Sequence, residues 1–156
     1  MAIDKDSAGD NMTEYVTVTI GDHLFGLPIS RVQDVFVPER LTRVPLAPPE
    51  VAGILNLRGR VVTAIDMRTR LDLGSRPKDR PAMAIGIEFR NESYGLLVDA
   101  VGEVMALRDS ACEAKPANLD PRLNKVAAGI YRLEGHLMVV LDVDRLLDIK
   151  NGAMAA

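Results

Sequence analysis

Hydrophobic and polar residues alternate along several short stretches of the chain, as they do in half-buried β-strands. Residues 15–20 alternate with period two, and a Gly-Asp turn leads from them into a second apolar stretch at 24–27. A similar pair of stretches follows at 83–89 and 94–98, again joined by polar residues. The pattern therefore predicts a mainly β protein, built from short strands joined by tight turns.

Apolar residues change their spacing after each of these two hairpins. Between residues 29 and 36, and again between 98 and 104, they recur about every three positions. This spacing predicts a short helical stretch in each half of the chain. Proline-rich connectors follow, and two further strands are then expected on either side of a glycine turn, at 58–59 and at 134–135.

The second half of the chain repeats the first. Residues 52–54 (Ala-Gly-Ile) recur at 128–130, and at this offset of 76 the surrounding 22 residues contain eight identities, where chance gives about one or two. Upstream, residues 25–27 match 94–96 at an offset of 69. The second copy therefore carries a seven-residue insertion, which we place in the loop 109–125.

The repeat predicts one cooperative unit made of two small β-barrel lobes that share a core. We expect lobe one at about 13–76 and lobe two at about 80–150, with exchange of strands between the lobes left open. A lobe of about 65 residues would be only marginally stable alone. Residues 1–12 are polar and aperiodic and are expected to be a disordered tail, and residues 151–156 form a C-terminal tail.

The composition excludes several functional classes. The chain is 47% hydrophobic and 26% charged, as in soluble globular proteins, and its apolar runs are too short to span a bilayer. It lacks an apolar signal segment, which points to the cytoplasm. One cysteine, Cys112, forms no intrachain disulfide, and the two histidines have no metal-ligand spacing, so we expect no metal and no cofactor. A net charge of −3 and few aromatic residues argue against nucleic-acid binding.

Asp66 and Asp142 are the candidates for a catalytic carboxylate pair, as in a hydrolase. Both follow a predicted strand and precede a predicted short helix, where an aspartate caps the first free backbone N–H groups. Because the repeat places them at equivalent points, we favour the capping role. His23 and His136 are interpreted as turn residues, and Cys112 as an unreactive thiol. The chain shows no other cluster of polar residues typical of an enzyme.

Arg58 is the residue that the architecture leaves unexplained. It lies in a predicted hairpin turn, two residues after Asn56, and the second copy has Glu134 at the same place. A long, permanently charged side chain at such a tip suits contact with a partner. A solvated surface arginine is equally common, and the residues alone leave the two interpretations open.

Three segments resemble the motifs of the CheW family. Residues 53–62 followed by 65–68 resemble its G-hydrophobic-x-N-L-R-G…D-L-R signature, residues 32–35 its V-Q-E segment, and residues 96–104 its G-L-x-V-D-x-V-x-E-V stretch. The motifs occur in the family's order and spacing. The expected CheW-like domain spans residues 13–150.

This resemblance implies a scaffold with no enzymatic activity. The fold would be two SH3-like five-stranded β-barrels related by internal duplication, with short helices. The protein would couple the cytoplasmic tips of chemoreceptors (methyl-accepting chemotaxis proteins) to the regulatory domain of a CheA-type histidine kinase, which has the same fold. It would be cytoplasmic and recruited to membrane-associated receptor arrays, without inserting into the membrane. The alternatives are an adaptor in a pathway of pilus motility or development and, more remotely, a small-barrel nucleic-acid binder.

The matching motifs also suggest which residues face the receptor. The expected receptor-binding residues are Asn56, Arg58, Gly59, Val32, Asp34 and Gly53. We further expect Arg58 and Asp34 to pair across the first lobe. Asp34 is one methylene shorter than the glutamate usual in the family, so the contact should be strained or bridged by water.

Overall fold

The computed structural model describes residues 11–74, 82–116 and 118–148. The first strand begins at Met12. Most of the expected N-terminal tail, the polar linker after residue 74 and the expected C-terminal tail lie outside the described residues.

The described chain forms ten strands and five short helical segments. The strands are β1 (Met12–Ile20), β2 (His23–Pro28), β3 (Val32–Phe36), β4 (Val51–Leu57), β5 (Arg60–Asp66), β6 (Met83–Phe89), β7 (Glu92–Val98), β8 (Ala100–Arg108), β9 (Ala127–Leu133) and β10 (His136–Leu141). The α-helices are α2 (Met67–Arg70), α3 (Pro121–Asn124) and α4 (Val143–Leu147), and the 3-10 helices are η1 (Ile29–Arg31) and η2 (Asp109–Ala111). None of the helices in these segments is long and apolar enough to cross a membrane.

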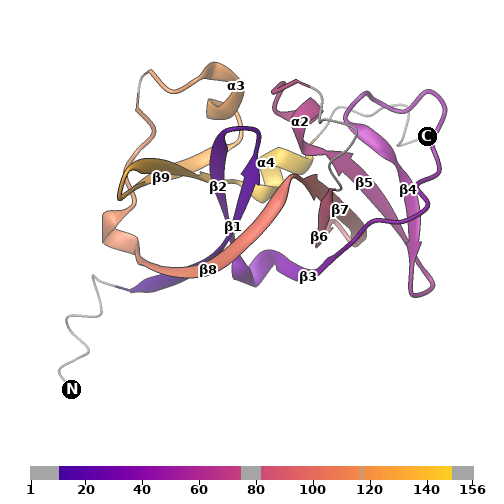
Figure 1. Ribbon diagram of the computed structural model, residues 1–156, viewed down its shortest axis with the longest axis horizontal. Coiled ribbons are helices and arrows are strands. Elements are labelled where there is room, and N and C mark those ends of the chain that lie inside the picture. Colours follow the sequence, from indigo (N-terminus) through magenta and orange to yellow (C-terminus); the bar gives the residue numbers. More distant parts are fainter. Residues whose placement is uncertain (1–10, 75–81, 117, 149–156) are drawn as a thin grey trace.

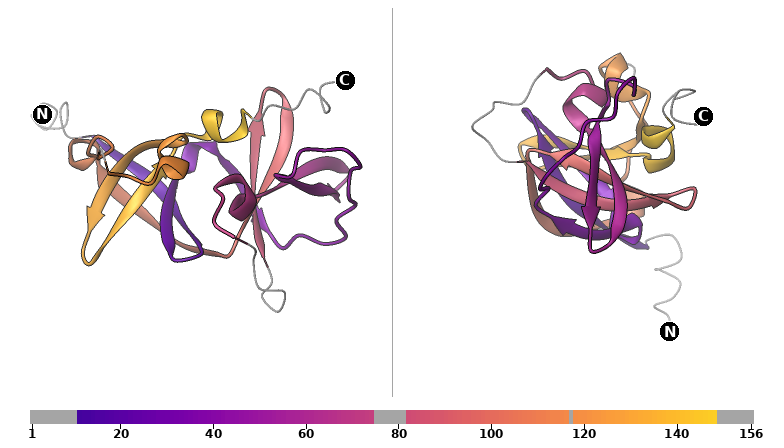
Figure 2. Two further views of the ribbon diagram at one scale, coloured as in Figure 1. Left: turned by 90° about the horizontal axis from the view of Figure 1, so that it is seen from above. Right: turned by 90° about the vertical axis from the view of Figure 1, so that its right-hand side faces the viewer.

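The strands form two five-stranded sheets, which confirms the expected mainly β, two-lobed fold. The sheet of lobe A has the order β8-β1-β2-β10-β9, and the sheet of lobe B has the order β3-β6-β7-β5-β4. Figure 1 shows lobe A as a mixture of indigo and orange strands, which come from opposite halves of the sequence. The left view in Figure 2, seen from above, separates the two lobes along the long axis of the molecule.

The sheet order resolves the question of strand exchange. Lobe A combines the first hairpin of copy one with the last three strands of copy two, and lobe B contains the reciprocal set. Replacing each strand by its counterpart in the other copy converts one sheet order into the other. A division of the chain at 13–76 and 80–150 therefore separates the two repeats and cuts through both sheets.

Each sheet is curled toward closure by one additional bridge. In lobe B, Thr42 forms an isolated antiparallel bridge with Ile54 of β4, and in lobe A, Glu113 forms one with Ile130 of β9. Ile54 and Ile130 are equivalent in the repeat. The segment after an edge strand thus reaches the opposite edge in both lobes, and the sheets are nearly closed barrels, not fully closed ones.

The helices predicted at 29–36 and 98–104 are wrong. Only η1 is helical in the first segment; β3 follows it directly, and β8 occupies most of the second segment. The register shows a bulge between Val32 and Asp34, and a matching irregularity where β8 pairs with β1. A β-bulge inserts one residue, so neighbouring residues on one face lie three positions apart instead of two. This spacing imitates a helical period in the sequence.

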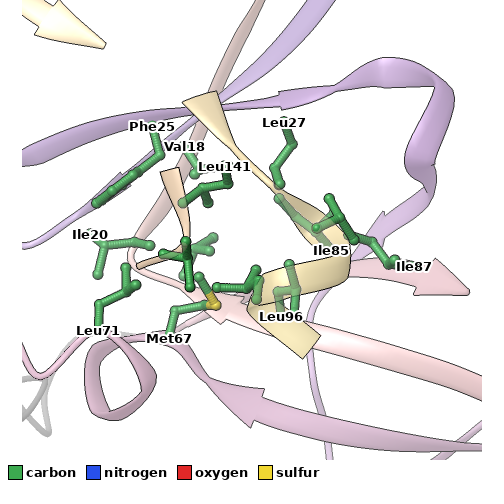
Figure 3. Packing of buried hydrophobic residues seen from close by; sticks show 14 of the residues in the cluster. Val18, Ile20, Phe25, Leu27, Met67, Leu71, Ile85, Ile87, Leu96 and Leu141 are labelled. Carbon is green, nitrogen blue, oxygen red and sulfur yellow. The ribbon is translucent and has the colours of Figure 1, made fainter. Parts of the chain in front are cut away.

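A single hydrophobic core joins the lobes (Figure 3). Met67 and Leu71, from the α2 region, meet side chains from both sheets, and each of the two is at most 1% exposed. The labelled residues of this cluster are Val18, Ile20, Phe25, Leu27, Met67, Leu71, Ile85, Ile87, Leu96 and Leu141. Two smaller clusters lie within the individual lobes. Because the largest cluster draws on both sheets, neither lobe has a complete core of its own.

Candidate functional site

The two candidate catalytic aspartates are helix caps. An oxygen of Asp66 accepts hydrogen bonds from the backbone N–H groups of Arg68 (3.0 Å) and Thr69 (3.4 Å), and Asp142 accepts one from Arg145 (3.2 Å). Each therefore satisfies free donors at the start of its short helix, α2 or α4. The capping interpretation is confirmed at both positions.

The turn between β4 and β5 presents Arg58 to solvent. Arg58 and Gly59 both have positive φ, 54° and 86°, as the two central residues of a type I′ hairpin turn require. The side-chain oxygen of Asn56 accepts a hydrogen bond of 2.8 Å from the Gly59 N–H. Two of the expected receptor-binding residues, Asn56 and Gly59, thus shape the turn that displays the third.

The expected pair between Arg58 and Asp34 is confirmed. Their closest nitrogen and oxygen lie 3.4 Å apart, a long contact for an ion pair. The Arg58 side chain is 74% exposed, whereas the Asp34 side chain is only 24% exposed. The short aspartate thus forms a direct but long contact, and it leaves most of the guanidinium facing solvent.

Asp34 is held by a close approach to the neighbouring strand. It lies opposite Gly86 of β6, and any side chain at Gly86 would overlap its second carboxylate oxygen. That oxygen is buried, and no group in the described part of the chain forms a hydrogen bond to it. Gly86 therefore creates the space in which the carboxylate lies, a role that the sequence analysis missed.

Neither of the other two expected site residues, Gly53 and Val32, is exposed at the surface. Gly53 lies where a Cβ atom would be 2.6 Å from the Thr42 carbonyl oxygen, so glycine permits the bridge that closes lobe B. Val32 is partly buried and packs against the shared core. Val61 of β5, beside the turn, is 64% exposed, whereas Val35 of β3 is 42% exposed on the face of the sheet opposite to Asp34.

Arg40, Asn56 and Val61 also line a groove of about 500 Å³ beside the turn. An exposed valine, a displayed arginine and a groove form a mixed apolar and charged surface on lobe B, of the kind found at protein interfaces. We call this surface, made by Asp34, Arg58 and Val61, the hairpin surface.

An ion pair that the sequence analysis also missed fixes lobe B to lobe A. Arg68 of α2 donates two hydrogen bonds to Asp99, of 3.1 and 2.6 Å, and Asp99 also accepts one of 2.8 Å from the Gly21 N–H in the β1–β2 turn. Both side chains are largely buried, 13% and 12% exposed. The hydrogen bonds to Asp99 raise the pKa of Arg68. Both residues lie in segments that resemble family motifs, but they are 31 positions apart.

The internal repeat contains a second, weaker version of this pair. Asp144 in α4 is equivalent to Arg68, and its carboxylate lies 3.0 Å from the guanidinium of Arg31. Arg31 directly follows Ser30, which is the equivalent of Asp99. The charges are reversed, and the side chains are more exposed, 33% for Arg31 and 66% for Asp144. Each pair thus ties a short helix to the segment that crosses from one lobe to the other.

The remaining candidates show no arrangement for chemistry. Cys112 is exposed and free. Within residues 11–74, 82–116 and 118–148, no three His, Cys, Asp or Glu side chains come together as metal ligands would.

These features define a class of mainly β protein: two curled sheets made by duplication with reciprocal strand exchange, carrying a charged turn on one lobe. The chain belongs to the CheW-like family, because the model described as "CheW-like domain" matches residues 14–151.

Curated relatives match over most of their length. The protein named "Chemotaxis protein CheW" of Klebsiella aerogenes is 25% identical over 141 residues, covering 90% of this chain and 85% of the relative. The "Probable chemotaxis protein CheW" of Rhizobium etli is 29% identical over 135 residues, covering 85% and 86%. Among solved structures, the scaffolding protein TtCheW from Thermoanaerobacter tengcongensis superposes with a TM-score of 0.77 at 27% identity, covering 88% of this chain and 89% of that one.

Proposed function

We propose that this protein is a non-enzymatic adaptor that couples chemoreceptors to a CheA-type histidine kinase in chemotaxis signalling. Membership in the CheW-like family supports this role, and a solved relative is described as a scaffolding protein. The adaptor acts in the cytoplasm and is recruited to membrane-associated receptor arrays. Its partners are the cytoplasmic tip of a receptor and the regulatory domain of the kinase.

The observation that carries the proposal is the display of Arg58. Its side chain is 74% exposed at a turn where the other repeat has Glu134, so the fold itself does not require an arginine there. The ion pair with Asp34 restricts the orientation of the guanidinium, and Val61 supplies exposed apolar area beside the turn. We assign the receptor contact to this hairpin surface, with Asn56, Gly59, Gly53 and Val32 maintaining its shape.

Calorimetry with a receptor tip fragment and with a kinase regulatory domain tests the proposal. Arg58→Ala should weaken receptor binding about tenfold and leave the melting temperature within about 2–4 °C, because an exposed ion pair contributes only about 0.2–1 kcal/mol to stability. Asp34→Ala should weaken receptor binding less. The double variant should lose less than the sum of the two, since the interaction between the residues is lost only once.

Arg132 provides the matched control. Like Arg58 it is exposed (64%) and paired with a carboxylate, 2.9 Å from Glu113, but it lies on strand β9 of lobe A. Arg132→Ala should leave receptor binding unchanged. The absence of binding to both partners would refute the adaptor role. Strictly additive losses for Arg58 and Asp34 would show that the two residues act separately.

A further inference from the structure

A second groove opens on lobe A at the place that corresponds, through the internal repeat, to the Arg58–Asp34 pair of lobe B. Its volume is about 660 Å³. Strands β1, β2 and β8 and the β9–β10 turn enclose it. The lining residues that matter here are Thr17, Glu103, Met105, Leu133, Glu134 and His136.

The charge pattern at this place differs between the copies. The offset of 69 makes Glu103 the equivalent of Asp34, and the offset of 76 makes Glu134 the equivalent of Arg58. Lobe B thus carries opposite charges that meet at 3.4 Å, whereas lobe A carries two carboxylates that line one groove. Within the described residues, neither glutamate side chain has a hydrogen-bond or ion-pair partner.

A second contact across the same surface is also specific to lobe B. Gln33 donates a hydrogen bond of 3.1 Å to Glu88, linking the two strands beside the Arg58–Asp34 pair. The equivalent residues in lobe A are Gly102 and Thr19, and neither has a side chain long enough for this contact. Both side-chain contacts that cross the surface of lobe B are therefore replaced in lobe A, and the groove there stays open.

The Thr17 side chain explains why Glu103 remains exposed. Thr17 is the equivalent of Gly86, whose missing side chain provides the space for Asp34 in lobe B. In lobe A the Thr17 side chain fills that space, and its hydroxyl donates a hydrogen bond of 2.7 Å to the Glu103 carbonyl oxygen. The carboxylate of Glu103 cannot lie across the strand as that of Asp34 does, and its residue is exposed.

We propose that the lobe A groove binds an arginine-bearing segment of a partner protein. The guanidinium takes the place between Glu103 and Glu134, as Arg58 does beside Asp34 in lobe B, and an adjacent aliphatic side chain packs on Met105 and Leu133. Two carboxylates at one site complement a planar guanidinium, which donates several hydrogen bonds at once. The assignment rests on charge complementarity and on the internal repeat, and it does not depend on the receptor contact proposed for lobe B.

A peptide with the sequence of residues 55–61, Leu-Asn-Leu-Arg-Gly-Arg-Val, is the probe, because its arginine fills the equivalent place in lobe B. Titrated into the ¹⁵N-labelled full chain at low salt, it should shift the amide signals of Thr17, Glu103 and Glu134. The combined Glu103→Gln and Glu134→Gln variant should bind it about tenfold more weakly, since two exposed charge contacts are lost. Glu14→Gln, which removes an exposed carboxylate of the same lobe that does not line the groove, is the matched control and should bind the peptide normally.

Three results would overturn the proposal. The first is the absence of shifts around the groove. The second is equal binding by the charge-neutralised variant, or equal binding of a peptide with glutamate in place of both arginines. The third is concentration-dependent self-association of the full chain that Arg58→Glu abolishes, because the occupant would then be a second copy of this chain. The two glutamine substitutions lie at exposed positions, so loss of folding does not confuse the test.

Discussion

Removal of the Arg68 side chain tests how strongly the largely buried ion pair joins the two lobes. Arg68→Ala removes the guanidinium that pairs with Asp99, at a site where both side chains are only 12–13% exposed. Loss of one partner of a buried pair costs about 3–5 kcal/mol. Asp99 keeps the hydrogen bond from the Gly21 N–H and some contact with water, so we expect a smaller loss, about 2–4 kcal/mol in the free energy of unfolding.

The pair between Arg31 and Asp144 provides an internal control for this prediction. It ties the other crossing segment to the other helix, but it is much more exposed. Arg31→Ala should therefore cost only about 0–1 kcal/mol. For a chain of this length, the two losses correspond to a fall in melting temperature of roughly 4–16 °C for Arg68→Ala and below about 4 °C for Arg31→Ala.

Urea unfolding followed by circular dichroism measures both losses, together with a double-mutant cycle of Arg68→Ala and Asp99→Ala. The cycle should give a coupling energy above about 1 kcal/mol, and high salt should reduce it little because the pair is shielded from solvent. The slope of the unfolding free energy with urea should be unchanged. Equal losses of unfolding free energy for Arg68→Ala and Arg31→Ala would refute the argument that burial sets the strength of the ion pair.

Two further predictions follow from the exchanged strands and from a buried tyrosine. Fragments 11–74 and 82–148 should each be largely unfolded alone and should fold together when mixed, because each sheet needs strands from both; two independently folded fragments would contradict this. The pKa of Tyr94 is raised to about 12, chiefly by burial, with a further contribution from its hydrogen bond to Glu92. The neutral phenol is thus favoured in the folded state, so its contribution to stability is complete below pH 10 and is lost as the pH rises toward 12. Tyr94→Phe should flatten this loss when the free energy of unfolding is measured from pH 9 to 12. An unchanged profile would contradict the assignment.

Local features of the fold were predictable from the sequence because local chemistry determines them. A glycine turn after Asn56, and an aspartate at each strand-to-helix junction, satisfy backbone groups within three residues of themselves. The internal repeat strengthened these predictions by showing the same residue type twice. The pair between Arg58 and Asp34 was expected from the family motifs and not from periodicity.

Features that depend on long-range pairing were not predictable. The alternation of residues marks a strand but does not say which strand it pairs with, so the exchange between the lobes had to come from the structure. The bulges at Val32 and near Val101 gave the apolar residues a spacing that imitates a helix. A bulge exists only in relation to the strand it pairs with, so the sequence of one strand alone does not reveal it. The pair between Arg68 and Asp99 joins two segments whose proximity follows only from the exchanged topology.

The duplication preserves the order of the strands, and it reverses the charge at two pairs of corresponding positions. The strand orders of the two lobes are identical under the repeat, and both lobes close by the same kind of bridge. Yet Arg68 corresponds to Asp144, and Arg58 corresponds to Glu134. A duplicated protein that kept its charges would offer the same surface twice and bind one kind of partner at both ends. Here the end of lobe B displays an arginine and the end of lobe A displays two unpaired carboxylates, so a partner that fits one end is repelled by the other. The two lobes are therefore chemically distinct at these corresponding places, as the proposed coupling of two different partners requires.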